Sequence, residues 1–202
     1  MVPEAESAWP EIAAVIASAP YPVEVLEADP TDAARCLHQL QVTTRSWLGA
    51  VVHRTGGIAV DHGWLRIFGA GHRGRALADV LTVNAGDVVG VIVAEDVLGG
   101  RFSWESSGSE AQPTIHYFGP DTLEWQDLDI GYGHWLGAMI GGASTQFYEN
   151  LRWPGWAAEV GTLRLDQGIS AYPPPSTVEG MDLGAARRGV VPMAELVTYY
   201  GS

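Results

Sequence analysis

An aspartate and three histidines lie close together in the first half of the chain, and these residue types could bind a metal ion. Asp61-His62 is followed by His72, and His53 lies upstream. Adjacent residues on a strand point to opposite faces, so Asp61 and His62 cannot easily share one ion. A turn explains Asp61-His62-Gly63 equally well, because an Asp side chain accepts hydrogen bonds from nearby backbone N–H groups and Gly adopts positive φ. We therefore expect no metal site.

Two kinds of motif could indicate catalysis or cofactor binding, and the sequence supports neither. The chain has no Gly-x-Ser-x-Gly sequence, which a nucleophile elbow requires. Gly69-x-Gly71-x-x-Gly74 has the spacing of a dinucleotide-binding loop. The preceding strand is predicted to be antiparallel, however, and no second βαβ half follows. We interpret these residues as a glycine-rich loop and expect no cofactor.

Carboxylate pairs could serve as general acids or bases, but their positions favour a structural role. Glu95-Asp96 leads into Gly99-Gly100, and Asp121 follows a strand in the same way. An Asp at the end of a strand commonly accepts hydrogen bonds from the backbone of the turn. We therefore predict that Asp96 and Asp121 form turns, and we expect no catalytic residue.

The composition excludes several classes of protein. The chain has 202 residues and a formal net charge of -13, with 47% hydrophobic and 17% charged residues. Nucleic acid and anionic membranes would repel such a surface, whereas a basic protein would be attracted. No apolar run reaches the roughly 18 to 20 residues of a membrane helix. The acidic N-terminus does not resemble a secretory signal, which predicts a cytoplasmic protein.

The single cysteine is expected to be structural. Cys36 lies at helical spacing with Ala33, Leu37 and Leu40. A small thiol on the apolar face of a helix is more often buried than reactive. No disulfide can form within the chain.

Hydrophobic periodicity and turn residues predict an α+β fold. Residues 7–19 form an amphipathic pattern, and Asp29-Pro30 begins a second helix, so two helices are expected before any sheet. Gly56-Gly57 is interpreted as a turn. Apolar helical patterns return at 133–140 and 144–151, the second with Ser144 as N-cap. We expect N-terminal helices, a mostly antiparallel central sheet, and C-terminal helices packed on it.

The sheet is predicted most clearly between residues 88 and 125. The run from Val88 to Asp96 is almost continuously apolar, as expected for a strand covered on both faces. The next strand, residues 101–105, is shorter and more polar, which indicates an edge strand. An unpaired edge could pair with a second copy of the chain, so a homodimer is one candidate assembly.

The domain organisation follows from a change in composition near residue 172. We expect a single α+β domain over residues 1–172 and a Pro-rich extension over 173–202, which contains Pro173-Pro174-Pro175. Residues 192–200 regain apolar character. Either a final helix or a disordered tail fits them.

Two sets of residues are candidates for binding. The first would form a pocket beside the sheet from Asp61, His62, Arg66 and His72, with Trp64 as one wall. The second consists of tryptophans that follow the sheet, which could belong to the core or to an interface. These tryptophans are Trp125, Trp135, Trp153 and Trp156, of which Trp125, Trp153 and Trp156 are the candidates for binding.

Two resemblances add to this interpretation. Asp61-His62-Gly63-Trp64-Leu65-Arg66 and Arg152-Trp153-Pro154-Gly155-Trp156 resemble motifs of a bacterial family of unknown function, over roughly residues 8–172. More faintly, the apolar strand ending in Glu-Asp-x-x-Gly-Gly and the later Asp-Thr-x-Glu-Trp resemble the core of the SUKH superfamily, although the Pro-rich tail departs from that pattern. The second resemblance implies an immunity-type protein that binds a toxin.

The leading hypothesis is therefore a protein-binding domain whose acidic surface engages a basic partner. The alternative is an enzyme or small-ligand-binding protein that uses the pocket around Asp61, His62, Arg66 and His72.

Overall fold

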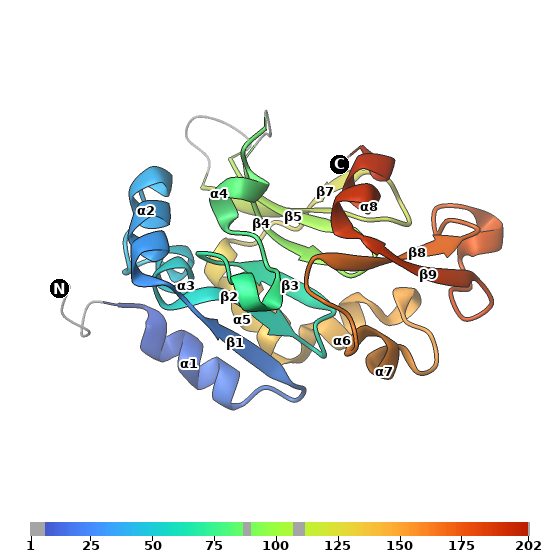
Figure 1. Ribbon diagram of the computed structural model, residues 1–202, viewed down its shortest axis with the longest axis horizontal. Coiled ribbons are helices and arrows are strands. Elements are labelled where there is room, and N and C mark those ends of the chain that lie inside the picture. Colours follow the sequence, from blue (N-terminus) through green and yellow to red (C-terminus); the bar gives the residue numbers. More distant parts are fainter. Residues whose placement is uncertain (1–6, 87–89, 107–111, 202) are drawn as a thin grey trace.

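The computed structural model describes residues 7–86, 90–106 and 112–201, and its centre is a seven-stranded antiparallel sheet (Figure 1). Each strand pairs with the next one along the chain, from β1 to β7. The expected α+β fold is confirmed. Val88 and Val89, where we expected the fourth strand to begin, lie outside the described residues. The strands are β1 (Val23–Glu27), β2 (Thr55–Val60), β3 (Leu65–Phe68), β4 (Val91–Asp96), β5 (Arg101–Glu105), β6 (Thr114–Phe118) and β7 (Trp125–Asp127).

Among the described residues, four α-helices belong to the N-terminal half. They are α1 (Trp9–Ala17), α2 (Pro30–Leu40), α3 (Trp47–Arg54) and α4 (Val80–Val83). Asp29 caps α2 as predicted, since its side chain accepts from the N–H groups of Thr31 at 2.8 Å and Asp32 at 3.2 Å. The expectation that two helices precede any sheet is wrong, because β1 lies between α1 and α2. This strand is short and lies at the edge of the sheet, and only Leu26 of its five residues is buried, so its pattern is weak.

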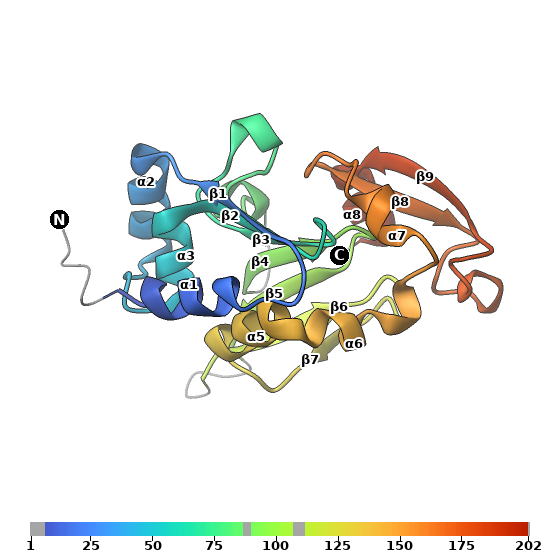
Figure 2. The same ribbon diagram turned by 90° about the horizontal axis from the view of Figure 1, so that it is seen from below.

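One face of the sheet is covered by helices (Figure 2). These include α5 (Tyr132–Ala138), the π-helical turn η3 (Met139–Ala143) and α6 (Ser144–Phe147). Aromatic rings form the contact: Trp135 packs on Phe102 at a centroid distance of 4.9 Å, and Phe147 packs on Tyr117 at the same distance. Large rings in contact bury much apolar area, which fixes these helices on the sheet.

The glycine pair Gly56-Gly57 is not a turn, because both residues lie inside β2. An added Cβ at Gly56 would lie 2.4 Å from the carbonyl oxygen of Gly71. At Gly57, where φ is +151°, it would lie 2.7 Å from the carbonyl oxygen of Ile67. The glycines therefore permit close approach of neighbouring backbone segments.

The strand β5 is central, which corrects the prediction of an edge strand. It pairs with β4 on one side and β6 on the other. Its polar residues Arg101 and Ser103 are 5% and 1% exposed, and Arg101 lines a cavity together with residues of α8. The edges of the sheet are β1 and β7.

The C-terminal part continues past the expected boundary at residue 172. Strand β8 (Gln167–Tyr172) pairs with β9 (Arg187–Pro192) in a separate two-stranded sheet, and α8 (Met193–Tyr200) follows. Of the two alternatives for residues 192–200, the structure has the helix. The remaining elements are η2 (Arg73–Arg75), η4 (Glu149–Leu151), α7 (Trp156–Val160) and η5 (Val178–Gly180).

Among the described residues, no helix is long and apolar enough to cross a membrane. The glycine-rich sequence of residues 69–74 follows the antiparallel strand β3, as predicted, and leads into a short 3-10 turn. It therefore lacks the strand-to-helix geometry of a dinucleotide-binding loop.

Candidate functional site

A row of charged side chains crosses the face of the sheet opposite to α5 and α6. In the strand register, Glu24 is opposite Ala59, Ala59 opposite Arg66, Arg66 opposite Glu95, and Glu95 opposite Arg101. Residues directly opposite on neighbouring strands project from the same face. The row therefore alternates in sign from Glu24 to Arg101, across the small side chain of Ala59.

The C-terminal part of the chain covers this row. The backbone N–H of Ile169 donates to the carbonyl of Val97 at 2.8 Å, which joins β8 to the end of β4. Helix α8 lies over the sheet, and the Tyr200 ring is 6.5 Å from that of Phe118. Three members of the row are consequently buried: Arg66, Glu95 and Arg101 are 0%, 7% and 5% exposed.

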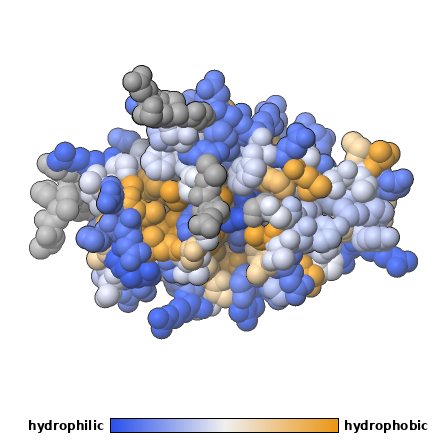
Figure 3. All heavy atoms as spheres, turned by 90° about the horizontal axis from the view of Figure 1, so that it is seen from above, coloured by the Kyte–Doolittle hydropathy of each residue, from blue (hydrophilic) through white to orange (hydrophobic). Residues whose placement is uncertain are grey.

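A cavity of about 480 Å³ remains between the sheet and α8, and we call it the α8 cavity. Glu95 and Arg101 contribute the buried charges of its lining. Its other lining residues are mostly apolar: Phe68, Ala76, Leu77, Ala78, Val83, Leu165, Pro192, Met193, Ala194 and Val197, with Asp166 and Thr198. Figure 3, which looks at the molecule from above, shows hydrophobic side chains gathered over α8 and, separately, on the side of α2 and α4. Apolar walls with few polar groups are typical of small-molecule sites.

Arg66 joins the sheet to the C-terminal part. Its Nε donates to the carbonyl of Gly63 at 3.2 Å, and its Nη1 donates to the carbonyls of Leu165 at 3.1 Å and Gln167 at 2.5 Å. Its Nη2 is buried without a hydrogen-bond partner among the described residues. Burial lowers the pKa of Arg66, and the carboxylates of Glu95 and Asp96 oppose this shift.

Glu95 lies between two arginines and is nevertheless hard to ionise. Burial raises its pKa to about 7, although Arg66 and Arg101 lower it. A carboxyl group with this pKa changes its charge near neutral pH, and such groups are concentrated at functional sites. Asp96, the next residue, points to the other face. Its Oδ1 accepts from the N–H groups of Leu98 and Gly100, both at 2.9 Å, so its predicted role as a turn residue is confirmed.

The predicted pocket residues do not line a single cavity. His62 and Arg66 line a small cavity of about 200 Å³ that also includes Glu24 and Arg75. His72 lines a different cleft, and its Nδ1 accepts from the N–H of Arg75 at 3.1 Å. Trp64 is fully buried on the helix-covered side of the sheet.

Asp61 and the predicted tryptophans meet instead around Arg152. The Arg152 Nη2 lies 2.5 Å from the Asp61 Oδ2 and donates to the Ser144 Oγ at 2.9 Å. Its guanidinium lies 4.2 Å from the ring centroid of Trp156 and 5.1 Å from that of Trp64. The prediction that Ser144 is an N-cap is wrong, because α6 continues directly from η3. The Ser144 hydroxyl instead forms hydrogen bonds within this buried cluster.

The remaining tryptophans divide between core and surface. Trp153 is buried at 2%, and its Nε1 donates to the Glu159 Oε2 at 2.8 Å. Trp125 is 42% exposed on the edge strand β7. Its ring centroid lies 5.6 Å from that of Phe118, with the two rings tilted by 56°. Asp61, Trp64, Trp153 and Trp156 thus belong to one packed region, from which Trp125 and His72 are distant in the fold.

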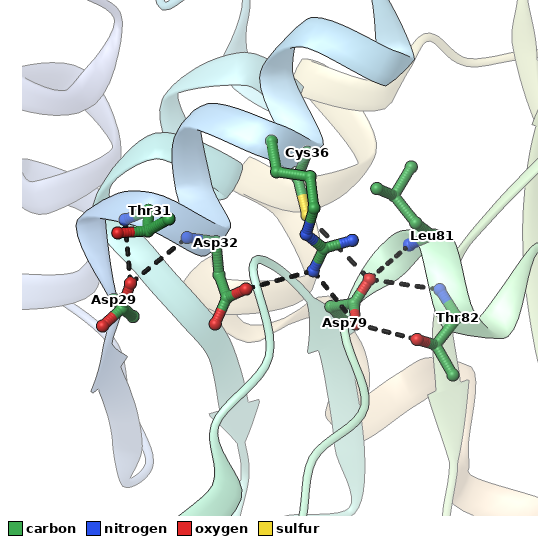
Figure 4. Close-up of polar contacts among 8 residues, drawn as sticks. Asp29, Thr31, Asp32, Cys36, Asp79, Leu81 and Thr82 are labelled. Carbon is green, nitrogen blue, oxygen red and sulfur yellow. Dashed lines mark hydrogen bonds and ion pairs between the residues drawn. The ribbon is translucent and has the colours of Figure 1, made fainter.

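A cleft of about 770 Å³, which we call the acidic cleft, lies between α2, η2 and the start of α4. Its four carboxylates, from Glu27, Asp29, Asp32 and Asp79, outnumber its two arginines, Arg35 and Arg73. Figure 4 shows Asp79 beside Cys36, with its carboxylate accepting from the N–H groups of Leu81 and Thr82. These contacts make Asp79 the N-cap of α4.

Cys36 is buried behind that cap, as predicted. Its Sγ lies 3.9 Å from the Asp79 Oδ1. Burial, together with the negative charge of Asp79, raises the pKa of this thiol to about 11. A thiol with this pKa is protonated near neutral pH, so we expect Cys36 to react slowly.

Sequence reasoning missed the roles of Glu95, Arg101 and Arg152. We interpreted Glu95 together with Asp96 as part of a turn, although alternation along the strand places the two on opposite faces. The available signal was a charged residue inside an apolar strand, since unpaired charges are rarely buried without a role. The partners of these residues come from distant segments, so the sequence alone does not reveal them.

The fold and its covered charged row define an α+β protein with a ligand-sized cavity. Comparison with known proteins assigns the chain more closely: residues 1–196 match the model of the family described as "Protein of unknown function DUF2625", and the chain belongs to that family. This confirms the first resemblance inferred from the sequence.

Two bacterial relatives match most of the chain. One is the "Putative uncharacterized protein YbfG" of Escherichia coli (strain K12), 36% identical over 172 residues, which cover 83% of this chain and 80% of the relative. The other is an "Uncharacterized protein" of Haemophilus influenzae, 34% identical over 170 residues, with 80% and 74% covered. No solved structure matches the chain. The resemblance to the SUKH superfamily gains no support from these comparisons.

Proposed function

We propose that this protein binds a small, mostly apolar molecule in the α8 cavity. The observation that carries the proposal is the pair Glu95 and Arg101, buried in the lining of a cavity of about 480 Å³ whose walls are otherwise apolar. Arg66 and Arg101 offset part of the charge of Glu95, and both Glu95 and Arg101 reach the cavity wall, where a polar group of a ligand could meet them. The apolar walls would hold the body of the ligand, and the two charged side chains would orient one polar group.

Filling the cavity tests this proposal. Val197 lines the cavity from α8 and is half-buried, so Val197→Trp would place a ring in the space that the ligand needs. A matched control is Val178→Trp, at a position that is 84% exposed. Thermal-shift screening of amphipathic carboxylic acids and amines against the wild-type protein would identify a ligand, since binding to the folded state raises the Tm.

We expect Val197→Trp to lose the ligand-induced rise in Tm and Val178→Trp to keep it. Native mass spectrometry of the purified protein would report any bound molecule directly. If a ligand binds Val197→Trp as tightly as it binds wild type, the α8 cavity is not its site.

A basic protein partner, for example a toxin that the chain neutralises, is a second candidate function. Its support is the net charge of -13 together with the acidic cleft, where Glu27 and Asp32 reach the surface. Such a surface would attract a basic protein, and the rate of their association would depend strongly on the salt concentration. Glu27→Gln with Asp32→Asn should remove the salt-dependent capture of the partner, whereas Glu179→Gln with Glu195→Gln, at exposed positions elsewhere, should retain it. Equal loss in both double variants would show that only net charge matters.

A further inference from the structure

The small cavity beside Arg66 is a separate feature, and we call it the Ala59 cavity. It has a volume of about 200 Å³ and is lined on the sheet side by Glu24, Ala59 and Arg66. His62 and Arg75, which are exposed and partly exposed, complete its polar lining. The polar side chains of its lining come from β1, β3, the turn after β2 and η2.

The hollow exists because Ala59 is small. Its partners in the register are Glu24 on one side and Arg66 on the other, and both have long side chains. A methyl group between two extended charged side chains leaves space above the sheet. Leu163 and Leu165 line the cavity from the C-terminal part without filling it.

The electrostatic balance of this cavity favours an anion. Arg66 and Arg75 supply two positive charges, and Glu24 supplies one negative charge. Glu95 lies on the other side of Arg66 in the row and has a pKa of about 7, so it is only partly ionised near neutral pH. Asp96 and Asp166 also attract Arg66; Asp96 points to the other face of the sheet, and Asp166 forms its own ion pair with Arg164 at 2.8 Å.

Hydrogen-bond donors remain available on this side. Arg75 holds Glu24 through its Nε at 3.0 Å and its Nη2 at 2.8 Å, which leaves its Nη1 outside that pair. A guanidinium carries five N–H donors. Arg66 has a buried Nη2 without a partner among the described residues, and the exposed His62 lines the same cavity.

We propose that the Ala59 cavity binds a small oxyanion of the phosphate type, with Arg75 and His62 as direct hydrogen-bond donors and Arg66 as the buried positive charge. Arginine donors suit the oxygens of phosphate, because several N–H groups lie in one plane. The volume accommodates a single tetrahedral anion and a few waters. This site is independent of the ligand proposed for the α8 cavity.

Calorimetric titration with inorganic phosphate tests the proposal, with sodium chloride at equal ionic strength as the reference for unspecific screening. Glycerol 3-phosphate forms a second arm, which distinguishes a free ion from the phosphate group of a larger molecule. The variants are Arg75→Gln and His62→Gln, both at accessible positions, and Ala59→Leu, which fills the hollow. Glu179→Gln is the matched surface control.

We expect saturable phosphate binding that each of the three variants weakens at least about tenfold, because each removes a charge-assisted hydrogen bond or the space itself. Glu179→Gln and Val197→Trp should bind phosphate like wild type, and the latter result separates this site from the α8 cavity. Binding of both phosphates indicates recognition of the phosphate group, and binding of inorganic phosphate alone indicates the free ion. Heats no larger than those with chloride, or equal affinity in Arg75→Gln and His62→Gln, would overturn the proposal.

Discussion

Arg152 and Asp61 lie 91 residues apart in the chain and form a largely buried ion pair of 2.5 Å. Trp156 and Trp64 lie against the guanidinium, so water has little access to its charge. The pair connects the turn after β2 to the segment after α6. It is therefore a tertiary link between the two halves of the molecule.

We predict that Asp61→Ala lowers the free energy of unfolding by about 3 to 5 kcal/mol, because it leaves the Arg152 cation buried without its carboxylate. Asp166→Ala is the matched control. It breaks an ion pair with Arg164 that is mostly exposed, and should cost about 0.5 kcal/mol or less. Urea denaturation measures the free energy of unfolding of both variants. Equal losses in the two variants would contradict the buried role of Arg152.

Arg66 should hold the C-terminal part of the chain on the sheet. Arg66→Met removes the donors to the carbonyls of Leu165 and Gln167, and buried carbonyls without donors are costly. We expect limited proteolysis to cleave the segment between β8 and β9 several times faster in this variant. Arg187→Met, an exposed change in the same hairpin, should leave the cleavage rate unchanged, and a similar rate for both variants would exclude an anchoring role.

Glu95 should make the stability depend on pH. Its pKa rises from 4.5 in the unfolded chain to about 7 in the folded protein, so the folded state binds this proton more tightly. The stabilising contribution is present in full below pH 4.5 and is lost as the pH rises through 7. In Glu95→Gln this loss should be absent. Between pH 4.5 and 7, the free energy of unfolding of the wild type should therefore fall, relative to that of the variant, by up to roughly 3 kcal/mol. If the free energy of unfolding changes with pH in the same way in wild type and variant, folding does not shift the pKa of Glu95.

The Cys36 thiol should react slowly in the native protein. Its side chain is fully buried, and its pKa is raised to about 11, so little thiolate is present at pH 8. We expect a thiol reagent such as DTNB to react at least about a hundredfold faster in denaturing urea than in buffer. Rapid reaction of the folded protein would mean that α2 opens easily away from α4.

The glycines of β2 should resist substitution. In Gly56→Ala, the new methyl group would meet the Gly71 carbonyl oxygen at 2.4 Å, and the backbone there cannot move without disturbing the sheet. We expect the free energy of unfolding to fall by about 3 kcal/mol or more. Gly189→Ala, where nothing lies within 4 Å of the added methyl group, should change the stability by about 0.5 kcal/mol or less. Thermal denaturation of Gly56→Ala and Gly189→Ala compares the stabilities of the two variants.

Local patterns determined much of this protein. Asp29-Pro30 starts a helix, and Asp96 closes the turn before β5, because both depend on hydrogen bonds to backbone groups only a few residues away. Alternation along residues 64–68 likewise identifies β3 and the opposite faces of its neighbouring side chains. Such features need no distant partner, so the sequence is enough to predict them.

Only the tertiary structure decided which side chains meet. Gly56 and Gly57 look like a turn until the segment around Gly71 is seen against them, and β5 looks like an edge until β6 is seen to pair with its second side. The register across three strands brings Arg66, Glu95 and Arg101 into one row, although no two of them are neighbours in sequence. Contacts of this kind depend on strand pairing and on packing between remote segments, whose free energies are not encoded in any short stretch of residues.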